Sequence, residues 1–114
     1  MELIEYQQLA QRTSSHQLLS SKIENGILGL CGESGECADL YKKYLYQGHE
    51  FDREAMKAEL GDVLWYCAEL AAGLGVTLED VAWANIEKLR KRYPDGFEVE
   101  RSVNREEKRH VEEN

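Results

Sequence analysis

Residues 21–46 read SKIENGILGLCGESGECADLYKKYLY, and this stretch decides the fold class. Its apolar residues recur at every third or fourth position, which is the spacing of one face of an amphipathic helix. That face consists of Leu19, Ile23, Ile27, Leu30, Cys31, Cys37, Ala38, Tyr41 and Leu45. Ser21 and Glu24 have the form of a capping box, so a long helix is predicted from there to about Tyr46, where Gln47-Gly48 ends it.

The rest of the chain shows the same helical period, and no stretch alternates as a β-strand does. A short amphipathic helix is predicted over residues 2–13. A third helix is predicted over residues 52–74 with Asp52 as its N-cap. A fourth is predicted over residues 77–93, where Pro94-Asp95-Gly96 ends it. Four helices joined by short connections predict an all-α fold, an antiparallel four-helix bundle.

The predicted bundle occupies residues 1–97, and residues 98–114 form a charged C-terminal tail. This tail mixes both signs of charge with almost no apolar residues, which is typical of a solvated, frayed or partner-dependent segment. The first residues are acidic where a signal peptide is basic, and no apolar run approaches the length of a membrane span. We therefore expect a single soluble domain in the cytoplasm.

The charge balance limits the partners of this chain. It has 22 acidic and 14 basic residues among 114, a formal net charge of −8, which argues against binding to nucleic acid or to an anionic membrane. Its three cysteines make no CxxC spacing, so neither a zinc site nor a disulfide framework is predicted. Because a chain of this size buries only about two-thirds of its unfolded surface, further burial in a homo-oligomer would add stability.

Four acids lie on the edges of two predicted apolar faces. Glu33 and Glu36 are three residues apart in the second helix, and Glu59 and Asp62 are three residues apart in the third. The usual alternative is a salt-bridged surface, but none of the four has a basic residue one turn away, whereas Asp39 is followed by two lysines. All-carboxylate ligation suits Mg²⁺ or, as a second choice, Mn²⁺. A di-iron centre fits less well because neither pair has the Glu-x-x-His form.

The fourth predicted helix carries amide and basic side chains instead of acids. Asn85, Lys88 and Arg92 share one face, and an amide with cations beside a carboxylate-bound metal suits the oxygens of a phosphate. Charged rim residues are the alternative interpretation. Tyr66 shares the edge of Glu59 and Asp62, where it would either contact a ligand or pack in the core.

Three blocks carry a resemblance to a known family. They are residues 29–36 (GLCGESGE), 59–66 (ELGDVLWY) and 85–97 (NIEKLRKRYPDGF), and their combination resembles the MazG-like all-α nucleotide pyrophosphohydrolases. The resemblance implies a four-helix fold that forms a dimer or tetramer. It also implies hydrolysis of nucleoside triphosphates to the monophosphate and pyrophosphate.

The resemblance further implies roles for individual residues. The implied Mg²⁺ ligands are Glu33, Glu36, Glu59 and Asp62, and the implied phosphate-binding residues are Asn85 and Lys88, with Arg92 matching the block in a less defined role. Lys88 would offset charge on the departing pyrophosphate, and either Glu36 or Glu59 would act as general base.

Two other functions stay open at this point. The same fold can be specialised for dUTP, dCTP, oxidised nucleotides or phosphoribosyl-ATP. Alternatively, the chain is a non-catalytic helical interaction protein whose acids hold a structural Mg²⁺.

Some residues receive a secondary interpretation. Trp65 and Trp83 point away from the apolar faces of their helices, which predicts a subunit interface, with stacking on a nucleotide base as the alternative. The glycines at every third position of residues 26–35 indicate close packing against another helix, with close approach of a phosphate as the alternative. Glu69 is a weak additional candidate for a metal ligand.

Overall fold

The computed structural model describes residues 1–105, which are helical without strands. The helices are α1 (Leu3–Gln11), α2 (Leu19–Tyr46), α3 (Arg53–Gly73), α4 (Leu78–Arg92) and α5 (Val99–Val103). An all-α fold is thereby confirmed for these residues. The chain divides into two compact units, one of residues 1–79 and one that begins at Asp80, and each is described by itself. No helix of the described residues is both long and apolar enough to cross a membrane.

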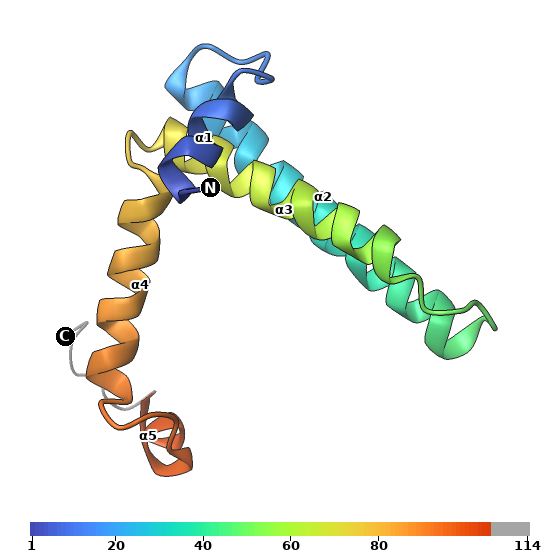
Figure 1. The fold of residues 1–114 in the computed structure, drawn as a ribbon, viewed down its shortest axis with the longest axis vertical. Coiled ribbons are helices and arrows are strands. Elements are labelled where there is room, and N and C mark those ends of the chain that lie inside the picture. The colour runs from blue at the N-terminus through green and yellow to red at the C-terminus, as the bar shows by residue number, and fades with distance from the viewer. Residues whose placement is uncertain (106–114) are drawn as a thin grey trace. The chain divides into compact units, whose positions relative to one another are not determined.

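The first unit is built on an antiparallel hairpin of α2 and α3, with α1 packed against α3 (Figure 1). Its buried apolar residues are Ala10, Ala68, Ala71 and Leu78, and Tyr6, Trp65 and Cys67 pack against them. The buried side chain of Gln7 accepts a hydrogen bond from the Leu78 backbone N–H (2.7 Å) and donates one to the Val76 carbonyl (3.1 Å). This amide therefore anchors α1 to the turn before α4, where the backbone would otherwise lack partners.

Glycine allows the helices of the hairpin to approach closely at one end. A β-carbon at Gly26 would lie 2.7 Å from Cβ of Leu70, closer than two carbons can pack. The predicted close packing is thus confirmed at this position. At Gly32 and Gly35 nothing beyond the helix's own neighbouring residues lies within 4 Å of the β-carbon position in this chain, so close packing there stays a prediction.

The start of α2 differs from the prediction. The helix begins at Leu19 and has no side-chain cap, so the capping box at residues 21–24 lies inside it. Tertiary packing accounts for the earlier start, because a β-carbon at Gly73 would lie 3.0 Å from the Leu19 carbonyl oxygen. The predicted cap of α3 is confirmed, since Asp52 Oδ1 accepts a hydrogen bond from the Ala55 backbone N–H at 3.0 Å.

The second unit contains most of α4, the turn after it, and α5. Gly96 has a φ of +94°, which glycine adopts without strain, and the rings of Tyr93 and Phe97 lie 5.3 Å apart across this turn. Helix α5 lies in the segment predicted as a charged tail, and its sequence pattern did not indicate a helix. None of its residues is buried. The remainder of that segment, residues 106–114, lies outside the described residues.

Candidate metal centre

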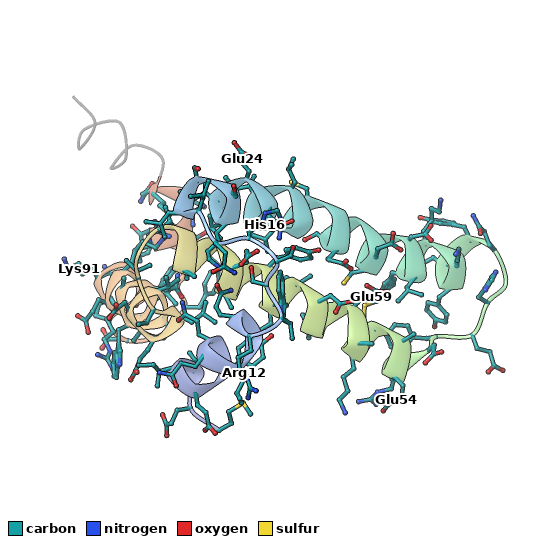
Figure 2. The ribbon with its side chains drawn as sticks, turned by 90° about the horizontal axis from the view of Figure 1, so that it is seen from above. Arg12, His16, Glu24, Glu54, Glu59 and Lys91 are labelled. Carbon is teal, nitrogen blue, oxygen red and sulfur yellow. The ribbon has the colours of Figure 1, made fainter. Side chains whose placement is uncertain are left out.

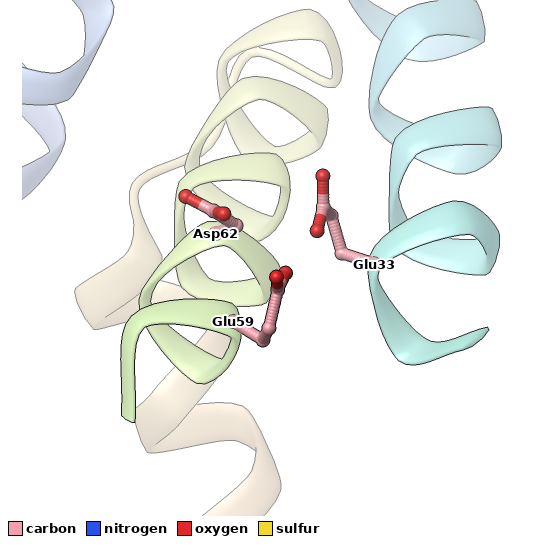
Figure 3. Close-up of side chains that lie close together, drawn as sticks. All are labelled: Glu33, Glu59 and Asp62. Atoms are coloured by element: carbon pink, nitrogen blue, oxygen red, sulfur yellow. The ribbon is translucent and has the colours of Figure 1, made fainter. Parts of the chain in front are cut away.

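Three carboxylates converge from the two helices of the hairpin. Glu33 extends from α2, and Glu59 and Asp62 extend from adjacent turns of α3 (Figure 3). One oxygen from each lies within 4.8 Å of the others, with Glu33 and Glu59 half-buried and Asp62 exposed. Glu59 lies between the two helices, whereas Glu54 on the same helix points outward (Figure 2). The structure therefore brings together three of the four predicted metal ligands.

The electrostatics of the group favour a bound cation. A hydrogen bond with Glu59 raises the pKa of Glu33, and partial burial and the charges of Asp62, Glu59 and Glu36 raise it further. Among residues 1–105, no ion pair involves any of the three converging acids. A set of carboxylate oxygens without a basic partner has the chemistry of a hard divalent cation site. No histidine or thiol belongs to the group.

The other predicted site residues lie outside this group. Glu36 is exposed one turn further along α2, although its charge still acts on Glu33. Asn85 and Lys88 are exposed on α4 and Arg92 is half-buried there. These three belong to the second unit, so their approach to the acids stays a prediction.

A cavity of about 310 Å³ adjoins the acids, lined by Glu33, Asp62, Trp65 and Tyr66. The two rings lie 5.0 Å apart and nearly perpendicular, at 82°. The Tyr66 ring rests on the backbone of α2 at Gly29, where a β-carbon would overlap it. Gly29, the second glycine of the predicted packing series, thus positions an aromatic side chain beside the carboxylates. Tyr66 both packs against α2 and lines the cavity, and its contact with a ligand stays a prediction.

Trp65 is held in place by hydrogen bonds within the chain, and its predicted part in a subunit interface stays a prediction. Its indole N–H lies 2.7 Å from Thr13 Oγ1 and 3.2 Å from the Ala10 carbonyl oxygen, and both accept from it. The ring points away from the apolar face of α3 because α1 covers that side. Only the placement of α1 revealed this, since Thr13 and Trp65 are far apart in the sequence.

Glu69 belongs to a buried polar network rather than to a metal site. Its carboxylate accepts hydrogen bonds from Gln11 (3.0 Å), Ser14 (2.8 Å) and Asn25 (2.8 Å), and its Oε1 lies 3.5 Å from Lys22 Nζ. Burial would raise the pKa of Glu69, but these hydrogen bonds and the Lys22 charge outweigh it and lower the pKa. The prediction of a further metal ligand at Glu69 is therefore wrong, because protein donors occupy its oxygens. The network joins α1, the loop after it, α2 and α3.

An acidic cluster between antiparallel helices, beside an aromatic wall, is consistent with a metal-dependent hydrolase acting on nucleotides. The model of the MazG nucleotide pyrophosphohydrolase domain matches residues 21–97, and the chain belongs to this family. The match confirms the resemblance seen in the sequence and includes all the predicted site residues. MazG proteins typically depend on a divalent metal.

One relative is the Gene 37 protein of Mycobacterium phage L5, which is 42% identical over 73 residues. The aligned segment covers 60% of this chain and 64% of the phage protein, so the chain spans less than two-thirds of that relative. Its name states no activity. No solved structure matches the chain significantly.

Proposed function

We propose that this protein hydrolyses nucleoside triphosphates, with ribose or deoxyribose, to the nucleoside monophosphate and pyrophosphate in a Mg²⁺-dependent reaction. The observation that carries the proposal is the convergence of Glu33, Glu59 and Asp62 without a basic partner in a chain of the MazG family. Mn²⁺ is the alternative cation, since it accepts the same oxygen ligands.

The proposed chemistry divides among the acids. Glu33, Glu59 and Asp62 hold the cation together with Glu36, and the bound ion supplies Lewis acidity toward the phosphate oxygens and the attacking water. Water attacks the α-phosphorus, the bond from that phosphorus to the bridging oxygen breaks, and pyrophosphate leaves. Glu36 and Glu59 are the two candidates for the base that accepts the water proton, and the one that the cation leaves partly free takes this role.

The remaining predicted residues bind the substrate in this proposal. Asn85, Lys88 and Arg92 contact the phosphates, and Lys88 offsets the charge that develops on the departing pyrophosphate. Tyr66 contacts the nucleotide from the cavity wall. A nucleotide substrate is consistent with a cytoplasmic location, which stays a prediction, as does the absence of nucleic-acid and membrane partners.

We further propose that a second copy of the chain completes the antiparallel four-helix bundle, in a dimer or a tetramer. The first unit buries few apolar side chains, whereas Leu28 and Leu60 of the hairpin are 72% and 63% exposed. Leu60 also lines an apolar hollow with Val63, Leu64 and Cys67, and a contiguous apolar patch of this kind is typical of an interface. Analytical ultracentrifugation would test this, and a stable monomer would contradict it.

The activity itself is tested by product analysis with a panel of ribo- and deoxyribonucleoside triphosphates, with and without Mg²⁺. We expect monophosphate and pyrophosphate only when the metal is present. Glu59→Gln should abolish turnover while the helical circular dichroism is retained, and Glu54→Gln, which changes an exposed acid of the same helix, should retain activity. Release of inorganic phosphate, or full turnover by a folded Glu59→Gln protein, would refute the proposal.

A further inference from the structure

A second cavity lies in the other unit, between the end of α4 and α5. It measures about 310 Å³ and is lined by Arg92, Glu98, Glu100, Arg101, Asn104 and Arg105. Three guanidinium groups and one amide thus face two carboxylates. This is an unusual concentration of cations in a chain whose formal net charge is −8.

The ion pairs of this cavity leave cationic groups unmatched. Arg101 Nε lies 3.4 Å from Glu98 Oε2, so these two charges compensate each other. Within the described part of the chain, neither Arg92 nor Arg105 forms an ion pair, although both are half-buried. Glu100 is exposed and also unpaired there. The unmatched groups therefore sum to one positive charge, carried by guanidinium groups that bind phosphate through two parallel hydrogen bonds.

The size and the position of this cavity restrict the kind of ligand that it can bind. The volume is at the lower end of the roughly 300–1,000 Å³ that small-molecule sites occupy, so it suits a compact anion better than a whole nucleotide. Arg92 follows Lys88 by one turn of α4, on the face that we propose to contact phosphates. The cavity thus extends that face beyond the end of the helix.

We infer that this cavity binds a diphosphate group, through Arg92, Arg105 and the Asn104 amide. The choice of diphosphate rests on the proposed function, in which such a group occurs twice, as the β- and γ-phosphates of the substrate and as the free pyrophosphate product. Helix α5 is then a part of the binding machinery, although none of its side chains is buried.

The test is calorimetric titration of the full chain with inorganic pyrophosphate in the presence of a chelator. Without a divalent cation the carboxylates of the candidate metal centre repel pyrophosphate, so any pyrophosphate binding that is measured comes from a basic site. Arg105→Gln should weaken binding about tenfold, the loss expected for one charge-assisted contact at a partly exposed site. Arg53→Gln removes the same charge from the exposed start of α3 and should bind as the unaltered chain does. Glu100→Gln should strengthen binding about twofold to threefold, since a nearby negative charge is removed.

Equal binding by Arg105→Gln and Arg53→Gln, or no binding by the unaltered chain at millimolar pyrophosphate, would overturn the inference. Steady-state kinetics of Arg105→Gln then separate the two sources of the diphosphate. A raised KM for the triphosphate indicates the substrate, whereas weaker inhibition by pyrophosphate at an unchanged KM indicates the product. Arg105-dependent pyrophosphate binding by a chain that hydrolyses no nucleotide would reject the proposed function and leave the cavity assignment intact.

Discussion

Replacing Glu69 by glutamine should destabilise the protein strongly, although Glu69 lies outside the metal centre. Its side chain is the largest that is fully buried, with 0% exposure, and it accepts hydrogen bonds from three elements besides its contact with Lys22. Glutamine retains one acceptor oxygen, presents an NH₂ group to donors, and leaves the Lys22 ammonium without a counter-charge. Breaking a buried charge pair costs about 3–5 kcal/mol.

The structure places the expected loss at the lower end of that range. The Lys22 side chain is 13% exposed, so its ammonium retains some access to water, and we expect about 3 kcal/mol. A chain of 114 residues has a total stability of roughly 6–17 kcal/mol, so this is a large fraction. The corresponding fall in Tm is about 12 °C or more.

The stability that Glu69 contributes depends on pH, and the direction of this dependence follows from its lowered pKa. Because the folded-state pKa of Glu69 is lowered from 4.5, its carboxylate contributes stability above about pH 4.5 and loses it as the pH falls through the lowered value. The gap between the unaltered chain and Glu69→Gln should therefore be full at neutral pH and shrink in acid. Thermal unfolding followed by circular dichroism, at matched protein concentrations, measures it. Glu24→Gln, an exposed acid of α2, is the control, and a Glu69→Gln chain within about 0.5 kcal/mol of it at neutral pH would refute the reasoning.

Three further predictions concern the same hairpin. Gly29→Ala places a methyl group against the Tyr66 ring and should destabilise the fold by about 1–3 kcal/mol. Gly32→Ala places the methyl group in open space and should stabilise the fold by up to about 1 kcal/mol. Urea unfolding measures both changes, and equal effects of the two variants would contradict the packing of Tyr66 on Gly29. The raised pKa of Glu33 means that protons compete with the cation, so calorimetry should show the Mg²⁺ affinity falling as the pH is lowered from neutral into the acid range. An affinity that does not change with pH would exclude this competition. Trp65→Phe removes the indole N–H that donates to Ala10 of α1 and to Thr13 just after this helix. It should lower the free energy of unfolding by about 1–2 kcal/mol, and an unchanged free energy would contradict this.

The local sequence was sufficient to predict most helix ends. Asp52 caps α3 as predicted, and α2 ends at Tyr46 as predicted, because these ends depend on residues within one turn. The start of α2 was not predictable in the same way. Its first turn packs against Gly73, and this contact between distant residues overrides the capping box.

The candidate metal centre was predictable because helical periodicity places acids on a face. The i,i+3 spacing of Glu59 and Asp62 determines their proximity, and the lack of nearby bases predicts a cation. That Glu33 meets them while Glu36 stands outside depends on how α2 and α3 rotate about their axes, which side-chain packing decides.

What the sequence determined by itself was the helical period, the acid pairs and the family. Only the tertiary structure decided which distant groups meet, as for Glu69, whose partners Gln11 and Asn25 are 58 and 44 residues away along the chain. A buried carboxylate requires hydrogen-bond donors wherever the fold brings them, and no local pattern records such partners. Periodicity is a property of one helix, whereas the satisfaction of a buried charge is a property of several elements packed together.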